Sequence, residues 1–130
     1  MAGKKYRTIK DEENLGRVSE LVKELPQYIK NFFRDMTNQG LSTATELGYA
    51  YDLAHFFEYL WTLPGVTEAD RTDRYPHLIE RLSYDDIQNY ISTVRTGSDL
   101  DGNKIIVTQR SDNYVARRVA SLRSFFTYCI

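Results

Sequence analysis

The stretch SDNYVARRVASLRSFFTYCI, residues 111–130, decides the fold class of the chain. Its apolar residues recur at the period of an amphipathic helix, and Ser111 stands where an N-cap is expected. The predicted buried stripe consists of Val115, Val119, Leu122 and Phe126. The helix reaches Cys129 and Ile130 without the glycine or asparagine that often caps a helix C-terminus. We therefore expect either a helix that docks into its own core or one piece of a longer protein.

The same helical period governs most of the remaining chain. Pro26, Gly40 and Ser42 mark helix ends and starts, and Ser83 with Asp86 forms a capping-box pattern. The further predicted helices cover residues 12–25, 26–39, 42–63 and 83–96, and the polar stretch 67–76 is expected to be a loop. The sequence therefore predicts an all-α protein, a bundle of four to five helices around an aromatic-rich core.

Two segments depart from this helical pattern. Residues 1–11 are polar and basic, and we expect them to form a flexible arm. Asp101-Gly102 is a turn signal beside the β-branched run Ile105–Thr108, which predicts a small hairpin or an extended insert. Residues 12–130 are then a single helical domain.

The composition is that of an ordinary globular domain. The chain has 130 residues, of which 42% are hydrophobic and 27% are charged. The N-terminus lacks the apolar core of a signal peptide, and no apolar run reaches the length of a membrane span. A single cysteine excludes an internal disulfide. We expect a cytoplasmic protein that has no membrane partner and is a monomer as an isolated domain.

The charge is unevenly distributed along the chain. The net charge is −1, but residues 11–100 carry 8 basic and 16 acidic side chains, whereas residues 1–10 and 101–130 are both net basic. A basic terminal helix on an acidic body suits contact with a polyanion. An ion-paired contact between that helix and the acidic body explains the same pattern equally well.

The sequence contains no recognisable catalytic or metal-binding constellation. His55 and His77 have no second histidine or cysteine at metal-ligand spacing, and Cys129 has no histidine partner nearby in sequence. Asp85-Asp86 is explained by the preference of acidic residues for the first turn of a helix. We expect no catalytic residue, no metal and no cofactor in this chain, which by itself is not an enzyme.

Two segments together resemble a known family. LSTATELGYAYDLAHFFEYL at 41–60 and the stretch quoted first are similar to the two signature helices in the N-terminal core-binding domain of tyrosine recombinases, the phage-type integrases. LSYDDIQNYI at 82–91 resembles the third helix of that domain, and LPQYIKNFFRDMTNQGLS at 25–42 resembles the first. The resemblance covers residues 25–130. The chain departs from the family at Tyr114, at Glu46, in the insert around Asp101-Gly102 and in the extra helix 12–25.

The resemblance implies a SAM-like orthogonal bundle that binds double-stranded DNA at a recombination site. Family members carry catalysis in a C-terminal domain with a His-x-x-Arg motif and a nucleophilic tyrosine, and neither can be placed here. The chain would therefore be a DNA-binding part of a phage or prophage integrase, cut off before its catalytic half. Other recombinase subunits on the same DNA would be its further partners, in DNA integration or excision.

The predicted DNA-binding residues lie on the two signature helices. Hydroxyls at the start of the helix that begins at Ser42 would bind phosphate beside free backbone N–H groups, and arginines of the last helix would reach phosphates or bases. The full set is Ser42, Thr43, Thr45, Tyr51, Ser111, Asn113, Tyr114, Arg117, Arg118 and Ser121.

Several plainer interpretations remain open at this level. Ser42 and Ser111 are explained by helix capping alone, and Arg117 and Arg118 by a solvated surface or an ion pair. Ten tyrosines and an acidic body also fit a helical protein–protein interaction module. A helix-turn-helix regulator is less compatible, because no tight pair of short helices is evident.

Overall fold

The structure is a computed structural model that describes residues 2–96 and 112–129. This part of the chain is all-α and contains no strand, which confirms the predicted fold class. Its helices are α1 (Ala2–Val22), α2 (Gln27–Asn38), α3 (Thr43–Leu60), α4 (Glu68–Thr72), α5 (His77–Arg81), α6 (Tyr84–Thr96) and α7 (Asp112–Cys129). Seven helices exceed the predicted four to five. The hairpin expected near Asp101-Gly102 and the N-cap Ser111 fall outside the described residues.

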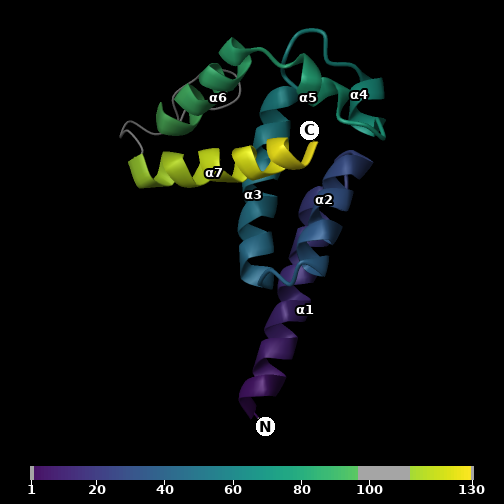
Figure 1. The fold of residues 1–130 in the computed structure, drawn as a ribbon, viewed down its shortest axis with the longest axis vertical. Helices are drawn as coiled ribbons and strands as arrows, with labels where there is room; N and C mark the ends of the chain where they lie inside the picture. The colour runs from purple at the N-terminus through teal and green to yellow at the C-terminus, as the bar shows by residue number, and fades with distance from the viewer. Residues whose placement is uncertain (1, 97–111, 130) are drawn as a thin grey trace.

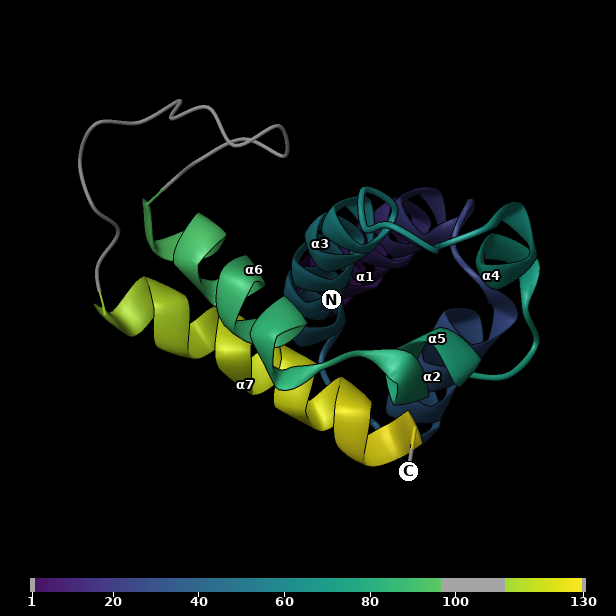
Figure 2. The same cartoon turned by 90° about the horizontal axis from the view of Figure 1, so that it is seen from above.

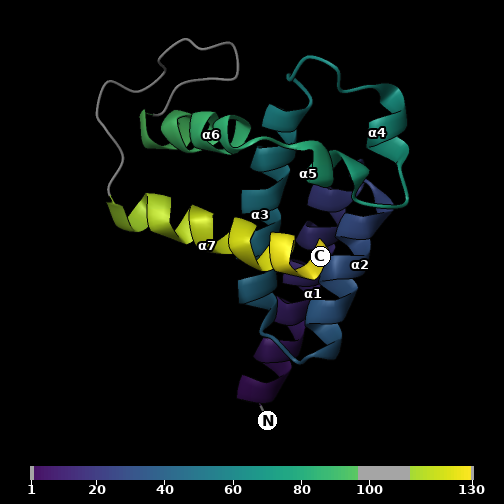
Figure 3. The same ribbon diagram turned by 45° about the horizontal axis from the view of Figure 1, so that its top comes forward.

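The third helix is the centre of the arrangement. Figure 1 shows α1, α2 and α3 along the long axis of the molecule, with α7 lying across α3. From above, α6 runs beside α7, while α4 and α5 lie over the side of α2 (Figure 2). The tilted view agrees that α6 and α7 form a layer across the upright helices (Figure 3). α3 therefore contacts α1, α2 and α7, and positions the residues of both predicted signature helices.

The core is aromatic, as the sequence predicted, and it forms where α7 crosses α3. Phe56, Phe57 and Phe125 are fully buried. The ring of Phe125 lies with its centroid 6.0 Å from that of Phe57 and 5.4 Å from that of Phe32, both in edge contact. Such pairs stabilise the core by about 1 kcal/mol each beyond the area that they bury. This cluster joins α2, α3 and α7 directly.

The predicted stripe of the last helix is only partly correct. Val115 and Leu122 are buried, whereas Val119 and Phe126 are partly buried. Phe125, which the stripe omitted, is fully buried. The reason is the crossing geometry: α7 contacts α3 on one side and α6 on another, so its covered surface is wider than one stripe.

The N-terminal segment is helical, so the expected flexible arm over residues 1–11 is wrong. α1 begins at Ala2 and packs along α3. Val18 and Val22 contribute buried side chains, and buried Asn14 donates a hydrogen bond to Thr43 Oγ1 at 3.0 Å. Lysine and arginine are good helix formers, which permits the helix to extend through the basic segment.

The junction between α2 and α3 follows the predicted caps. Gly40 has φ +80°, its N–H donates to the Thr37 carbonyl at 3.0 Å, and the Leu41 N–H donates to the Met36 carbonyl at 3.3 Å. This is the Schellman arrangement, which places a left-handed residue after the helix. Ser42 then caps α3 by accepting a hydrogen bond from the Thr45 N–H at 3.2 Å.

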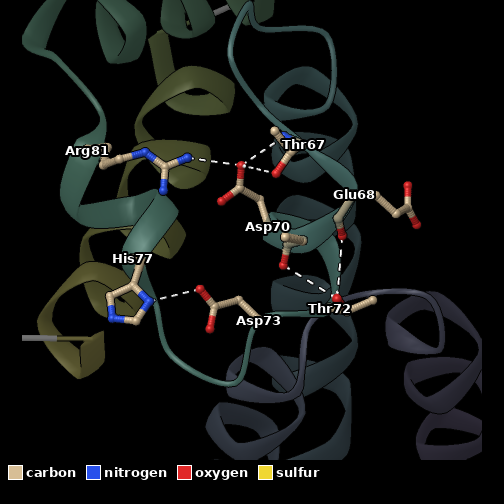
Figure 4. A network of polar contacts seen from close by, with 8 residues as sticks. Thr67, Glu68, Asp70, Thr72, Asp73, His77 and Arg81 are labelled. Atoms are coloured by element: carbon tan, nitrogen blue, oxygen red, sulfur yellow. Dashed lines mark hydrogen bonds and ion pairs between the residues drawn. The ribbon is translucent and has the colours of Figure 1, made fainter.

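The stretch 67–76, predicted to be a loop, instead contains α4. Thr67 and Asp70 form a reciprocal capping box, in which the Thr67 N–H donates to Asp70 Oδ2 at 2.8 Å. Asp70 also accepts a hydrogen bond from Arg81 of α5 at 2.9 Å (Figure 4). A second link, between Asp73 and His77 at 2.9 Å, holds the same connection. The predicted capping box of α6 is confirmed, because Asp86 accepts from the Ser83 N–H at 2.9 Å.

Replacing Gly40 with alanine is expected to destabilise the protein by about 1 kcal/mol, because alanine resists the left-handed conformation. Urea unfolding followed by circular dichroism measures the change. Gly16→Ala is the matched control: Gly16 lies inside α1 with nothing within 4 Å of an added Cβ, so the same substitution should stabilise slightly. Equal effects at the two sites would contradict the role of Gly40.

The stability of the α4–α5 connection should depend on pH through Asp70. The Thr67 backbone N–H, followed by the hydrogen bond and charge of Arg81, holds the pKa of Asp70 below its usual value despite burial. A folded-state pKa below the unfolded one contributes stability at neutral pH that is lost as the pH falls below about 4.

Asp70→Asn should therefore lower the melting temperature at neutral pH and weaken its decline in acid. Arg81→Gln should reproduce only part of this change, because the Thr67 N–H remains. An acid profile of Asp70→Asn as steep as that of the wild type would refute the assignment.

Candidate nucleic-acid interface

The crossing of α3 and α7 forms an open groove that contains several of the predicted DNA-binding residues. Its volume is about 300 Å³. The lining residues are Thr45, Gly48, Tyr49 and Asp52 from α3, and Arg117, Ala120 and Ser121 from α7. Thr45 and Arg117, 72 positions apart in the sequence, therefore lie on one surface.

Asp52 holds the two walls of this groove together. Its carboxylate is almost fully buried, and Oδ2 accepts a hydrogen bond from Ser121 Oγ at 2.6 Å. Oδ1 lies 3.3 Å from Arg118 Nε and 3.7 Å from Arg117 Nη2. One carboxylate of α3 thus contacts three side chains of α7, which fixes the rotation of α7 about its own axis.

Ser121 and Arg118 are largely buried against Asp52, so they offer DNA little of the surface that the sequence predicted, although Ser121 still lines the groove. Ser121 is 4% exposed, and its hydroxyl is committed to Asp52. Only 14% of the Arg118 side chain is exposed, and its Nη2 donates to the Tyr114 hydroxyl at 2.9 Å. A buried charge of this kind is retained where an opposite charge neutralises it, and Asp52 supplies that charge.

The charge of Arg118 is maintained inside the protein. Burial acts to lower the pKa of its guanidinium, but the hydrogen bond to Tyr114, followed by the effects of Tyr90 and Asp52, outweighs burial, so the net shift of the pKa is upward. Arg118 is therefore a structural cation that links α7 to the acidic centre of α3.

Arg117 is the exposed cation of the site. Its side chain is 56% exposed, and its guanidinium carbon lies 5.7 Å from the centre of the Tyr114 ring. The exposed side chain of Asn113 lies one turn earlier on α7, and Tyr114 is partly exposed. Arg117 therefore presents positive charge at the mouth of the groove while the Tyr114 ring supports it from one side.

Thr43 and Tyr51 face α1 instead of the groove. Thr43 Oγ1 donates to Asp11 at 2.6 Å, and the Tyr51 hydroxyl accepts from Arg17 Nε at 3.0 Å. Ser42 and Thr45 remain exposed at the start of α3, where they hydrogen-bond each other at 2.8 Å. The predicted DNA-binding residues of α3 are therefore divided between two faces. Thr45 lies on the same face as Arg117, whereas Thr43 lies on the face that contacts α1.

Glu46 is not on the surface of this groove. It is 1% exposed, accepts a hydrogen bond from the Thr37 hydroxyl at 2.5 Å, and lines a different groove between α1 and α2. The acidic departure from the family pattern therefore places no negative charge beside Arg117.

A partly buried hydrogen bond between α3 and α6 was not predicted. His55 Nδ1 and the Tyr90 hydroxyl lie 2.7 Å apart and connect α3 to α6. The sequence placed His55 beside the buried stripe of α3, but nothing in it paired this residue with α6.

Features of other site classes are not found in the described residues. Within 2–96 and 112–129, no cluster of three or more potential ligands could hold a metal ion, and no helix is long and apolar enough to cross a membrane. Burial, followed by the charge of Glu80, raises the pKa of the Cys129 thiol to about 11, so the thiolate needed for nucleophilic attack is scarce at neutral pH.

The chain matches no protein-family model, no curated protein and no solved structure. The resemblance to the core-binding domain is therefore carried by the sequence alone.

The Asp52–Ser121 hydrogen bond should be important for stability. Ser121→Ala removes the only hydroxyl bound to Asp52 Oδ2 in the described structure, and we expect a loss of about 2 kcal/mol in the free energy of unfolding. Ser124→Ala is the control: Ser124 lies one turn further along α7, is exposed, and has only a long 3.5 Å contact with the Tyr49 hydroxyl, so stability should change by less than about 0.5 kcal/mol. Chemical unfolding of both variants measures the difference, and indistinguishable midpoints would contradict it.

Proposed function

We propose that this chain is the DNA-binding core-binding domain of a tyrosine recombinase, and that it binds duplex DNA across the groove between α3 and α7. The observation that carries the proposal is the exposed guanidinium of Arg117 beside the exposed start of α3. Both signature helices identified by resemblance meet at this one surface.

The groove offers two kinds of contact to a phosphate backbone. The first is the charge of Arg117, which can donate two hydrogen bonds to one phosphate. The second is the positive end of α3, where the hydroxyls of Ser42 and Thr45 surround first-turn N–H groups. Gly48 and Ala120 line the space between them and add no bulk that would keep a sugar–phosphate chain away.

The interaction should be weak and sensitive to salt. Asp52 neutralises part of the charge that Arg117 and Arg118 bring, so few uncompensated cations face the DNA. In a recombinase, the covalently linked catalytic domain would raise the local concentration of this domain at its site and compensate for weak binding. The chemistry of strand cleavage is assigned to that second domain.

A protein–protein interaction module is the second candidate function. A groove of about 600 Å³ lies between α5, α6 and the end of α7, and Ile87 and Phe126 are among the residues that line it. Tyr84 at its edge is 77% exposed, and tyrosine is enriched in protein interfaces. Contacts between recombinase subunits would be compatible with both functions.

The test is fluorescence polarisation of the purified chain with a labelled duplex at about 50 mM and about 200 mM salt. Arg117→Gln should weaken binding about tenfold at low salt and reduce the slope of log affinity against log salt by about one. Arg71→Gln is the matched control, since Arg71 is an exposed arginine that stacks on Trp61, the residue that follows α3, outside the groove.

Equal losses for Arg117→Gln and Arg71→Gln would show that binding is diffuse, and the proposal would fail. If the wild-type chain did not bind DNA at low salt, the protein–protein interaction module would replace DNA binding as the favoured function.

A further inference from the structure

A second pocket, more polar than the groove between α3 and α7, shares no lining residue with that groove. It is formed by α2, the connection between α4 and α5, and the end of α7, and has a volume of about 680 Å³. This size is within the range of small-ligand sites. The residues that matter here are Tyr28, Asn31, Arg34, Arg74, Tyr75 and Tyr128.

The pocket is positively charged within an acidic part of the chain. Arg34 and Arg74 both line it, although residues 11–100 contain only 8 basic against 16 acidic side chains. None of the described residues that line the pocket is acidic. Asp73 and Asp70 also act on Tyr28, but they are paired with His77 and Arg81, so the lining itself, with two arginines and no carboxylate, favours an anion.

A buried hydroxyl lies at this pocket without a partner. Tyr28 is 4% exposed, and its hydroxyl makes no hydrogen bond to any protein group in the described structure. The hydroxyl oxygen itself has almost no accessible surface, so a ligand reaches it only when a neighbouring side chain moves aside. Its ring is fixed by stacking on Phe125, with centroids 6.2 Å apart. Burial, followed by the nearby Cys129, raises the pKa of Tyr28, so its hydroxyl keeps its proton at neutral pH and can donate it to an acceptor.

Asn31 is held so that it presents further donors. Its Oδ1 accepts from Gln27 Nε2 at 3.1 Å and from Arg34 Nη2 at 3.2 Å. Because the oxygen is occupied twice, the amide N–H groups are the part of Asn31 that can bind a ligand. The same contacts hold Arg34 against Asn31 on α2.

We infer that this pocket binds a small phosphate ester that carries a planar ring. The phosphate would accept hydrogen bonds from Tyr28 and Asn31 and pair with the guanidinium groups of Arg34 and Arg74. The exposed rings of Tyr75 and Tyr128, 60% and 40% exposed, offer surfaces on which the planar ring can stack. The site is independent of the DNA-binding surface proposed above.

The unpartnered hydroxyl gives this site a distinctive signature. A buried hydroxyl without a partner destabilises the free protein, whereas it stabilises a complex in which an acceptor reaches it. Tyr28→Phe keeps the ring and its stacking but removes the hydroxyl. It should therefore raise the melting temperature of the free protein and weaken the complex.

The experiment is an NMR titration of the labelled chain with a nucleoside monophosphate, the matching nucleoside and inorganic phosphate. We expect the monophosphate to shift resonances of α2 and the α4–α5 connection, with inorganic phosphate weaker and the nucleoside weakest. Arg74→Gln and Tyr28→Phe should each weaken monophosphate binding about tenfold. Arg71→Gln, three residues before Arg74 and not among the pocket residues, is the matched control.

Three results would overturn the inference. Equal affinity of wild type and Tyr28→Phe would mean that the buried hydroxyl is not a donor to the ligand. Shifts spread over exposed lysines would indicate nonspecific anion binding only. Shifts of the same resonances on addition of duplex DNA, lost in Arg74→Gln, would show that the pocket belongs to a nucleic-acid-binding surface and is not a separate site.

Discussion

The structure depends on one buried carboxylate. Asp52 of α3 accepts a hydrogen bond from the Ser121 hydroxyl, and its carboxylate lies within 4 Å of the guanidinium groups of both Arg117 and Arg118. A charge at this depth is costly unless it is paired, so each partner on α7 is required in its place. The aromatic cluster around Phe125 provides the bulk of the attraction between the two helices, but apolar contact alone tolerates sliding and rotation. Asp52 selects one register and one rotation of α7, and in doing so leaves Arg117 at the surface.

The same constraint explains why the two adjacent arginines have different roles. Neighbours on a helix point about 100° apart, so they cannot both follow one carboxylate into the interior. Arg118 lies over the Tyr114 ring with its guanidinium inside, hydrogen-bonded to the Tyr114 hydroxyl. Arg117 remains 56% exposed and contacts Asp52 only at the margin. Of the two adjacent arginines, only Arg117 therefore contributes a cation to the surface. The net charge of α7 in the sequence is larger than the net charge that α7 exposes.

Helix-capping signals in the sequence were reliable, whereas contacts between distant helices could not be predicted from it. Gly40, Ser42 and the Ser83–Asp86 box act through residues at most five positions away, so the sequence shows both partners together. The Thr67–Asp70 box has the same form and was overlooked because its helix is only five residues long. The burial of Ser121 depends on a residue 69 positions away, and the cover over Thr43 depends on Asp11, 32 positions away. Helical periodicity indicates which face of a helix is buried. It cannot show that a serine hydroxyl is turned inward by a carboxylate on another helix.

The position of α7 also has a consequence for how the chain acquires its structure. Asp52 and the core ring of Phe125 are 73 positions apart in the sequence, and α3 is therefore synthesised well before α7. Until α7 emerges, α3 has a carboxylate with no cationic partner and a set of aromatic rings with one side uncovered. Contacts of such high sequence separation slow folding and leave apolar surface accessible to other chains in the meantime. The helices that precede α7 should therefore remain loosely assembled until α7 packs across α3, so cooperative folding of this bundle depends on that one long-range contact.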